Sequence, residues 1–199
     1  QYQHQIHIPH AVNTEIFKKI DKEIVHKLRE DNKGPDGRSL ADRFVVLFNS
    51  RNARRKHSGT LVFWFKEFLD KVGHENAVLL MHTEPKDPNG PDLSQIVTDL
   101  ELDNGQVLFS REKLDEQKIA TLYNLADVTV NISDAEGFGL SCLESLACET
   151  PVIVQKTGGL QEQVTDGENE FGVGIEPSSQ QMVGSQLVPY VMEDRLSKD

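Results

Sequence analysis

The sequence predicts an α/β fold, a doubly wound parallel sheet with helices on both faces. Apolar runs of strand length alternate with segments of helix length almost to the end of the chain. These runs are continuously apolar, as expected for parallel strands that helices bury on both faces. With 199 residues, of which 37% are hydrophobic and 27% charged, the chain has a globular composition and suits a single domain over residues 1–199.

Each expected strand is followed by an expected helix. The strands are predicted at residues 44–48, 77–82, 107–109, 128–132, 152–155 and 171–175. The helices are predicted at residues 60–71, 91–100, 115–126, 140–148 and 160–164, with a final helix from about Ser178. Pro91 favours a helix start, and Asp115 is a typical N-terminal cap. Because ligands of such sheets bind beyond the carboxyl ends of the strands, functional residues should follow strands directly.

The composition also excludes some classes of partner. A formal net charge of −11 argues against general binding to nucleic acid or to anionic lipid. No apolar run approaches the ~20 residues of a membrane span, so we expect no membrane insertion. Cys142 and Cys148, on one helix, would point about 240° apart, which predicts two reduced thiols in a cytoplasmic protein. The chain begins without an initiator methionine, and we expect a fragment of a longer protein.

A basic cluster follows the first predicted core strand. Four of the 21 Lys and Arg residues fall within six positions, namely Arg51, Arg54, Arg55 and Lys56. At the carboxyl end of a buried strand, such groups are placed to neutralise a diphosphate, each charge-assisted hydrogen bond contributing about 1.5–3 kcal/mol. The alternative is a solvated basic loop without a ligand. The position of the basic cluster directly after a strand favours ligand binding over this alternative.

A glycine-containing turn lies between the strand at 128–132 and the helix that follows it. Gly137 and Gly139 allow the backbone to approach a ligand closely and to adopt positive φ. The N-terminus of the next helix presents free N–H groups and a partial positive charge, which favour an anion. Glu136 precedes this N-terminus and Glu144 lies just over one turn into the helix. A carboxylate of this kind can accept hydrogen bonds from two vicinal hydroxyls of a ribose or a hexose.

Two other kinds of site are disfavoured. Residues 137–142 lack the third glycine of a dinucleotide-binding fingerprint and follow a late strand rather than an early one. His4, His7 and His10 recur every three residues, but an extended stretch points His4 and His7 to opposite faces, and Pro9 argues against a helix. We therefore expect no metal site.

With these motifs in place, the chain resembles the retaining GT-B glycosyltransferases, specifically glycosyltransferase family 4, the group 1 glycosyltransferases. The resemblance covers most of the chain, from Ile8 to about Pro177. This stretch resembles the C-terminal, Rossmann-like half of that fold. The matching motifs, in order, are residues 8–17, Arg51 with Lys56, Glu136 with Glu144, residues 147–153, and residues 158–162 with 166–169. Their order and intervals together make the likeness specific.

The resemblance implies a role for each motif in binding a nucleotide-diphospho-sugar. Glu144 would bind the nucleotide ribose, and Glu136 the transferred sugar near its 3-hydroxyl. Arg51 and Lys56 would stabilise the departing diphosphate. The backbone around the turn would approach the sugar and phosphate, at Gly137, Phe138, Gly139 and Leu140. Base contacts would lie at Phe109, Ser110 and Arg111.

The resemblance also implies partners. A hexose would pass from the donor, with retention and without a bound metal or other cofactor, to a saccharide, a lipid-linked group or another hydroxyl acceptor. The acceptor domain would precede this one and is absent here, so we expect donor binding without efficient turnover. Localisation would be cytoplasmic, with the whole enzyme possible at the inner membrane surface. No nucleic-acid partner is expected.

Some positions depart from the family pattern, since Ala11, His57, Glu149 and Glu170 stand where glycine is common. These departures leave open a non-catalytic sugar-nucleotide-binding or interaction module. A related GT-B sugar-nucleotide epimerase is a further alternative. A glucan phosphorylase would need a pyridoxal-phosphate lysine, for which the sequence offers no candidate, and a glycoside hydrolase would not need the basic cluster.

Overall fold

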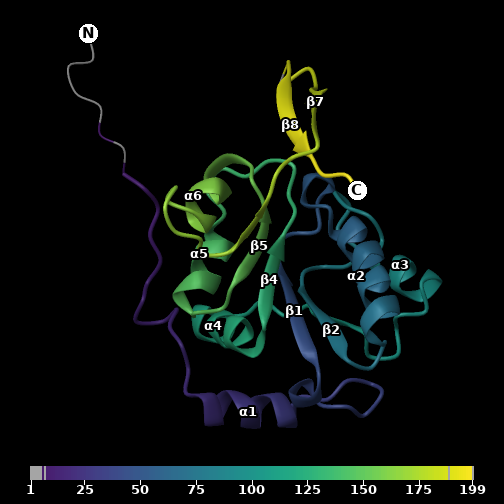
Figure 1. Cartoon of the computed structure of the whole chain (residues 1–199). Coiled ribbons are helices and arrows are strands. Elements are labelled where there is room, and N and C mark those ends of the chain that lie inside the picture. The colour runs from purple at the N-terminus through teal and green to yellow at the C-terminus, as the bar shows by residue number, and fades with distance from the viewer. Residues whose placement is uncertain (1–5, 7, 188, 199) are drawn as a thin grey trace.

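The computed structural model describes residues 6, 8–187 and 189–198 and contains a six-stranded parallel sheet (Figure 1). The strand order is β3-β2-β1-β4-β5-β6. The strands are β1 (Phe44–Asn49), β2 (Ala77–His82), β3 (Val107–Ser110), β4 (Val128–Asn131), β5 (Val152–Gln155) and β6 (Val173–Ile175). This confirms the predicted doubly wound α/β fold, and every predicted strand is present.

Helices cover both faces of the sheet. On one face lie α2 (Ser58–Val72) and α3 (Leu93–Asp99), and on the other lie α4 (Glu116–Leu125), α5 (Leu140–Ala147) and α6 (Gln161–Val164) (Figure 1). Side chains alternate along β1, so that Val46 and Phe48 pack under α2 while Val45 and Leu47 pack under α4. The continuous apolar run of this strand is thereby explained, because it is buried on both faces.

Local chemistry sets several of the helix starts. The Asp92 carboxylate accepts a hydrogen bond from the backbone N–H of Gln95 at 3.0 Å, and Asp115 does the same for Lys118 at 2.9 Å. Both residues are N-terminal caps. The sequence had predicted this role for Asp115. Caps of this kind satisfy backbone donors that the first helical turn leaves unpaired.

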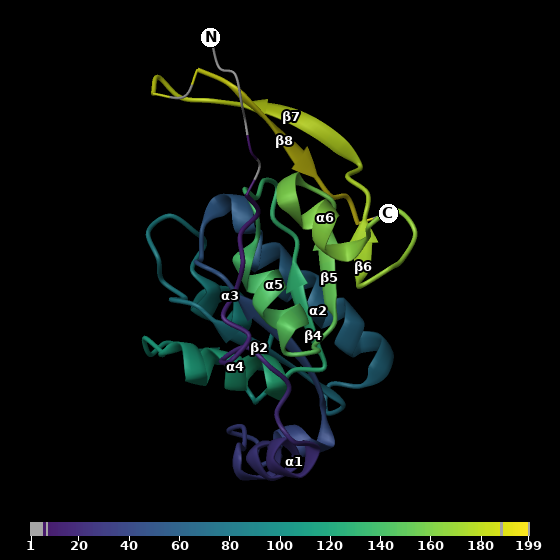
Figure 2. The same ribbon diagram turned by 90° about the vertical axis from the view of Figure 1, so that its left-hand side faces the viewer.

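One helix was not predicted. Helix α1 (Lys22–Asp31) lies at the amino ends of the strands, and none of its residues is buried. Polar contacts hold it instead. The Asp21 carboxylate caps its N-terminus by accepting from Glu23 N, and Arg29 forms an ion pair with Asp127 at 2.7 Å. Figure 2 shows the preceding segment running down over α5 toward α1.

The predicted final helix from Ser178 is wrong. The chain there forms an antiparallel hairpin, β7 (Ser179–Val183) and β8 (Val191–Arg195), that projects from the carboxyl edge of the sheet (Figures 1 and 2). Met182 pairs with Met192 across the hairpin, and Glu193 is buried in an ion cluster against the body. Tertiary anchoring of β8 therefore overrides local helical preference. Within the described residues, no helix is both long and apolar enough to cross a membrane.

Candidate functional site

Two loops meet where the strand order reverses. The chain runs outward from β1 through β2 and β3 and then returns to β4, which pairs with β1 in parallel. The loop after β1 contains a 3-10 turn, η2 (Arg54–Lys56), and the loop after β4 leads into α5. They are joined by the backbone N–H of Asp134, which donates to the Arg55 carbonyl at 2.9 Å. Ligands of doubly wound sheets bind in such a crevice.

An ion pair joins these two loops. The Lys56 ammonium donates a short hydrogen bond to Glu136 Oε1, and both side chains are only 10% exposed. Burial lowers the pKa of Lys56, and Glu136 opposes that shift. Burial works to raise the pKa of Glu136, but Lys56, Asn131 and Arg55 together outweigh it, so the pKa of this carboxyl is lowered. The structure thus brings together two of the residues predicted to bind the donor.

Three further side chains hold the Glu136 carboxylate. Asn131 Nδ2 and Ser133 Oγ lie 3.3 and 3.4 Å from Oε1, and Arg55 Nη1 lies 3.5 Å from Oε2. Asn131 and Ser133 are buried. None of the three was singled out from the sequence, although Arg55 belongs to the basic cluster. The sequence signal that could have found Asn131 is a polar amide at the end of β4.

Arg51 is differently placed. Its side chain is 65% exposed, and its guanidinium pairs with Asp87 through Nε–Oδ2 and Nη2–Oδ1 distances of 2.6 and 3.2 Å. Asp87 lies in the loop between β2 and α3. The Arg51 guanidinium, with help from Asn89, holds the pKa of the Asp87 carboxyl well below its usual range. Arg51 is therefore at the carboxyl edge but occupied by an acidic neighbour that the sequence did not reveal.

Glu144 is anchored by a buried tyrosine. The Tyr123 hydroxyl donates to Glu144 Oε2 at 2.7 Å and accepts from Asn49 Nδ2 at 2.7 Å. Burial raises the pKa of Glu144, against the effect of the Tyr123 bond. These contacts link the end of β1, helix α4 and helix α5. Tyr123 and Asn49 were not predicted, because nothing local connects them to Glu144.

The glycine turn forms the start of α5. Gly139 is its N-cap residue with φ of 85°, and a Cβ there would lie 2.3 Å from Leu160 Cδ2, so only glycine fits. Gly137 is not in the left-handed region, and a Cβ there would meet nothing within 4 Å. Phe138 lies between them, and Leu140 begins the helix with its side chain half exposed.

The next loop packs directly against this turn. Gly158 has φ of 50°, and a Cβ there would lie 1.8 Å from the Glu136 carbonyl oxygen. Gly159 N donates to the Gly137 carbonyl at 3.1 Å. Gln163 Nε2 donates to the Phe138 carbonyl at 2.5 Å. The glycine pair therefore allows the loop after β5 to support the backbone that carries Glu136.

The residues predicted to contact the base lie farther along the same edge. Phe109 and Ser110 end β3, and the Arg111 guanidinium lies 5.8 Å from the centre of the Phe109 ring. Ser110 Oγ is 3.0 Å from His82 Nδ1. Strand β2 separates β3 from β1, so these residues share the carboxyl edge without touching the Lys56–Glu136 pair.

Two departures from glycine have a backbone consequence. His57 and Glu149 have φ values of 53° and 58°, whereas Ala11 and Glu170 do not adopt positive φ. The left-handed backbone of Glu149 costs on the order of 1 kcal/mol relative to glycine. The ring of His57 contacts a buried carboxylate, with Nε2 2.6 Å from Asp134 Oδ1.

The cysteines are free and buried, as expected from their spacing. Burial raises the pKa of Cys142 to about 12 and that of Cys148 to about 11. Within the described part of the chain, no group of three or more His, Cys, Asp and Glu side chains is placed to hold a metal ion. His4 and His7 lie outside the described residues.

Known proteins are similar to this chain in sequence and in fold. A D-inositol 3-phosphate glycosyltransferase from Paenarthrobacter aurescens is 32% identical over 143 residues, 69% of this chain and 33% of that protein. An α-maltose-1-phosphate synthase from Mycolicibacterium smegmatis is 29% identical over 165 residues, 79% of this chain and 42% of that protein. The chain therefore spans less than half the length of these curated relatives.

Solved structures agree. Sucrose-phosphate synthase from Thermosynechococcus elongatus has a TM-score of 0.64 at 28% identity, covering 84% of this chain and 38% of that one. The C-terminal domain of a group 1 family glycosyl transferase from Francisella tularensis has a TM-score of 0.65 at 26% identity, covering 85% and 82%. The described fold, with its strand-order reversal between β1 and β4, is thus that of GT-B glycosyltransferases. Residues 31–197 match the family described as glycosyl transferases group 1, and the chain belongs to that family.

Proposed function

We propose that this chain is the donor-binding domain of a retaining family 4 glycosyltransferase, which transfers a hexose from a nucleotide-diphospho-sugar to a hydroxyl acceptor. The buried Lys56–Glu136 pair carries the proposal. It places a cation for phosphate and an acceptor for sugar hydroxyls side by side. Both lie next to the N-terminus of α5, where the helix dipole favours an anion.

In this proposal Lys56 acts on the leaving group. The bond between the anomeric carbon and the diphosphate oxygen breaks, and its electron pair stays on that oxygen. Lys56 and Arg51 stabilise the resulting charge, together with the α5 N-terminus. Glu136 accepts a hydrogen bond from the sugar near its 3-hydroxyl. No metal or other cofactor is needed for this charge balance in the proposal.

The nucleoside would lie along the carboxyl edge toward β3. Glu144, held by Tyr123, accepts from the two ribose hydroxyls, and the backbone of Phe109, Ser110 and Arg111 contacts the base. A protein from Anabaena whose structure contains UDP matches with a TM-score of 0.63 at 25% identity, over 84% of this chain and 42% of that one. UDP is therefore the first nucleotide to test.

The acceptor would bind to a second domain. The 82% coverage of an isolated C-terminal domain, against less than half of the longer relatives, supports assigning this chain to the C-terminal half of a two-domain GT-B enzyme. A saccharide or lipid-linked acceptor is proposed, in a cytoplasmic enzyme that can work at the inner membrane surface.

Calorimetric titration tests the proposal. The purified chain is titrated with UDP, GDP and ADP without metal, alongside Glu144→Ala and Arg51→Ala. We expect one nucleotide to bind and both substitutions to weaken it. A folded chain that binds none of the three at millimolar concentration contradicts the proposal.

A non-catalytic sugar-nucleotide-binding module is the second candidate. It is favoured by the left-handed His57 beside Lys56, where the family commonly has glycine. Joining the chain to an acceptor domain from a relative separates the two. Sugar transfer supports the enzyme, whereas donor binding without transfer supports the module.

A further inference from the structure

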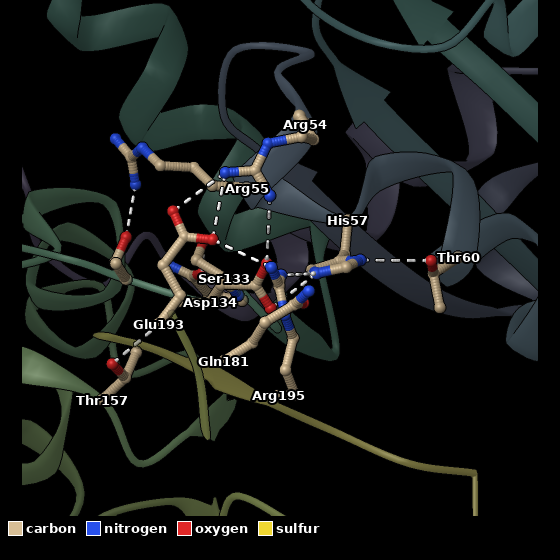
Figure 3. Close-up of polar contacts among 12 residues, drawn as sticks. Arg54, Arg55, His57, Thr60, Ser133, Asp134, Thr157, Gln181, Glu193 and Arg195 are labelled. Atoms are coloured by element: carbon tan, nitrogen blue, oxygen red, sulfur yellow. Dashed lines mark hydrogen bonds and ion pairs between the residues drawn. The ribbon is translucent and has the colours of Figure 1, made fainter. Parts of the chain in front are cut away.

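A cluster of charged side chains, built around two buried carboxylates, joins the C-terminal hairpin to the loops after β1 and β4 (Figure 3). Its centre is Asp134, whose side chain is completely buried. The Asp134 carboxylate contacts His57 Nε2 at 2.6 Å and forms a short ion pair with Arg195 of β8. Arg54 Nη1 lies 4.0 Å from the same carboxylate. An isolated buried carboxylate is costly, so these partners are what keep it there.

A second carboxylate completes the cluster. Glu193 of β8 is also buried, and it accepts from Arg54 Nη2 at 2.9 and 3.0 Å and from Arg195 Nη2 at 3.0 Å. Burial, with the nearby charges of Arg195 and Arg54, lowers the pKa of His57. With His57 neutral, two carboxylates balance two guanidinium groups. The hairpin contributes one member of each sign.

The Asp134 backbone makes three more links. Its N–H donates to the Arg55 carbonyl at 2.9 Å, and its carbonyl accepts from Asp194 N at 3.0 Å and from Thr157 Oγ1 at 3.3 Å. One residue therefore ties together the loops after β1, β4 and β5 and the hairpin. Lys56 lies between Arg55 and His57, and Glu136 lies two residues after Asp134.

We propose that Asp134 and Arg195 are positioning residues of the donor site, which lock the β7–β8 hairpin onto both loops and thereby hold Lys56 beside Glu136. The identity of the ligand rests on the proposed function. The attachment of the hairpin to the two loops does not depend on it. His57 connects the two parts, because its left-handed backbone ends the η2 turn that carries Lys56 while its ring contacts Asp134. In this proposal the β7–β8 hairpin is part of the donor site.

Two measurements test this on the full chain. The first is amide hydrogen exchange by mass spectrometry without ligand, and the second is calorimetric titration with UDP. Asp134→Asn keeps the shape of the side chain and removes its charge. Arg195→Gln removes the guanidinium on the hairpin side of the same ion pair. Because it lies away from the sheet, it serves as the second variant if Asp134→Asn does not fold. Asp194→Asn is the matched control, because its side chain bonds Gln180 on the hairpin, not the cluster.

We expect Arg195→Gln to accelerate exchange in residues 50–57 and 133–139 by about tenfold, with β1 and β4 unchanged. The UDP Kd should rise by about tenfold, and Arg195→Lys should recover part of it. Asp194→Asn should change neither quantity. If a folded Arg195→Gln variant accelerates exchange only in residues 178–198, the hairpin is merely anchored there and the proposal is overturned. If the unsubstituted chain binds no nucleotide, the proposed function fails. The exchange result still decides whether the contact between Asp134 and Arg195 holds the two loops.

Discussion

Two cations of one loop behave differently in this molecule. Lys56 is buried beside Glu136, whereas Arg51, five positions earlier, is 65% exposed and paired with Asp87. The buried pair is held from several sides by Asn131, Ser133 and Arg55. In the second pair the Arg51 guanidinium faces solvent, where an ion pair is screened and contributes little, although the Asp87 side chain is only 11% exposed. A cluster of basic residues in the sequence therefore does not show which cation is buried in a site and which stays exposed to solvent.

Removing Lys56 should have the largest effect. Lys56→Ala leaves the Glu136 carboxylate with no ammonium partner, so we expect a loss of about 2 kcal/mol in the free energy of unfolding. Nucleotide binding should weaken by about a hundredfold. Urea unfolding and calorimetric titration measure the two effects. The control is Lys118→Ala, an exposed lysine in a weak contact with Asp115. An unchanged nucleotide Kd would contradict the role given to the buried pair.

Tyr123→Phe extends the comparison to a second buried carboxylate. It removes the hydroxyl that donates to Glu144 and accepts from Asn49. We expect about 1–2 kcal/mol lower stability. Nucleotide affinity should fall by about tenfold, since Glu144 is then free to turn away from the ribose. Tyr190→Phe, on an exposed tyrosine, is the control. Equal binding by the two variants would remove Tyr123 from the site.

At the exposed pair the two partners should act in opposite directions. Arg51→Ala should weaken nucleotide binding by about fivefold, while Asp87→Asn should strengthen it by a few-fold, because the guanidinium no longer has to leave a carboxylate to reach the phosphate. Titration calorimetry of both variants at low and high salt measures this. Weaker binding by Asp87→Asn would show that Asp87 orients Arg51 rather than competing for it.

The smallest effect concerns pH. The pKa of His57 is lowered by burial and by Arg195 and Arg54, so below its ordinary value of 6.5 the unfolded chain takes up a proton more readily than the folded chain. Stability should therefore fall as pH decreases from about 7 to about 5.5. His57→Asn, which tolerates the left-handed backbone, should show a shallower fall in Tm. The comparison with the unsubstituted chain cancels His82, whose pKa is also lowered. Parallel curves would contradict this assignment.

Much of the fold follows from local pattern. Apolar runs predicted all six strands of the sheet. In β1 and β2 the runs are continuous because helices bury both faces, whereas β6 at the edge of the sheet is mostly exposed. Asp115 was predicted as a cap because its contact, to Lys118 N, lies three residues away. Helix α1 was missed because it buries no residue, and the hairpin was missed because its anchors, Arg54 and Asp134, are remote in sequence.

The sequence by itself therefore determined the βα repeat, the caps, the glycine turn and the presence of Lys56, Arg51, Glu136 and Glu144 after strands or at helix starts. Only the tertiary structure decided which charges meet. The strand reversal between β1 and β4 brings Lys56 to Glu136, and the fold of the last segment brings Arg195 to Asp134. The physical reason is distance along the chain. Periodicity and capping act over a few residues, whereas an ion pair between remote segments exists only after the sheet has closed the loops between them.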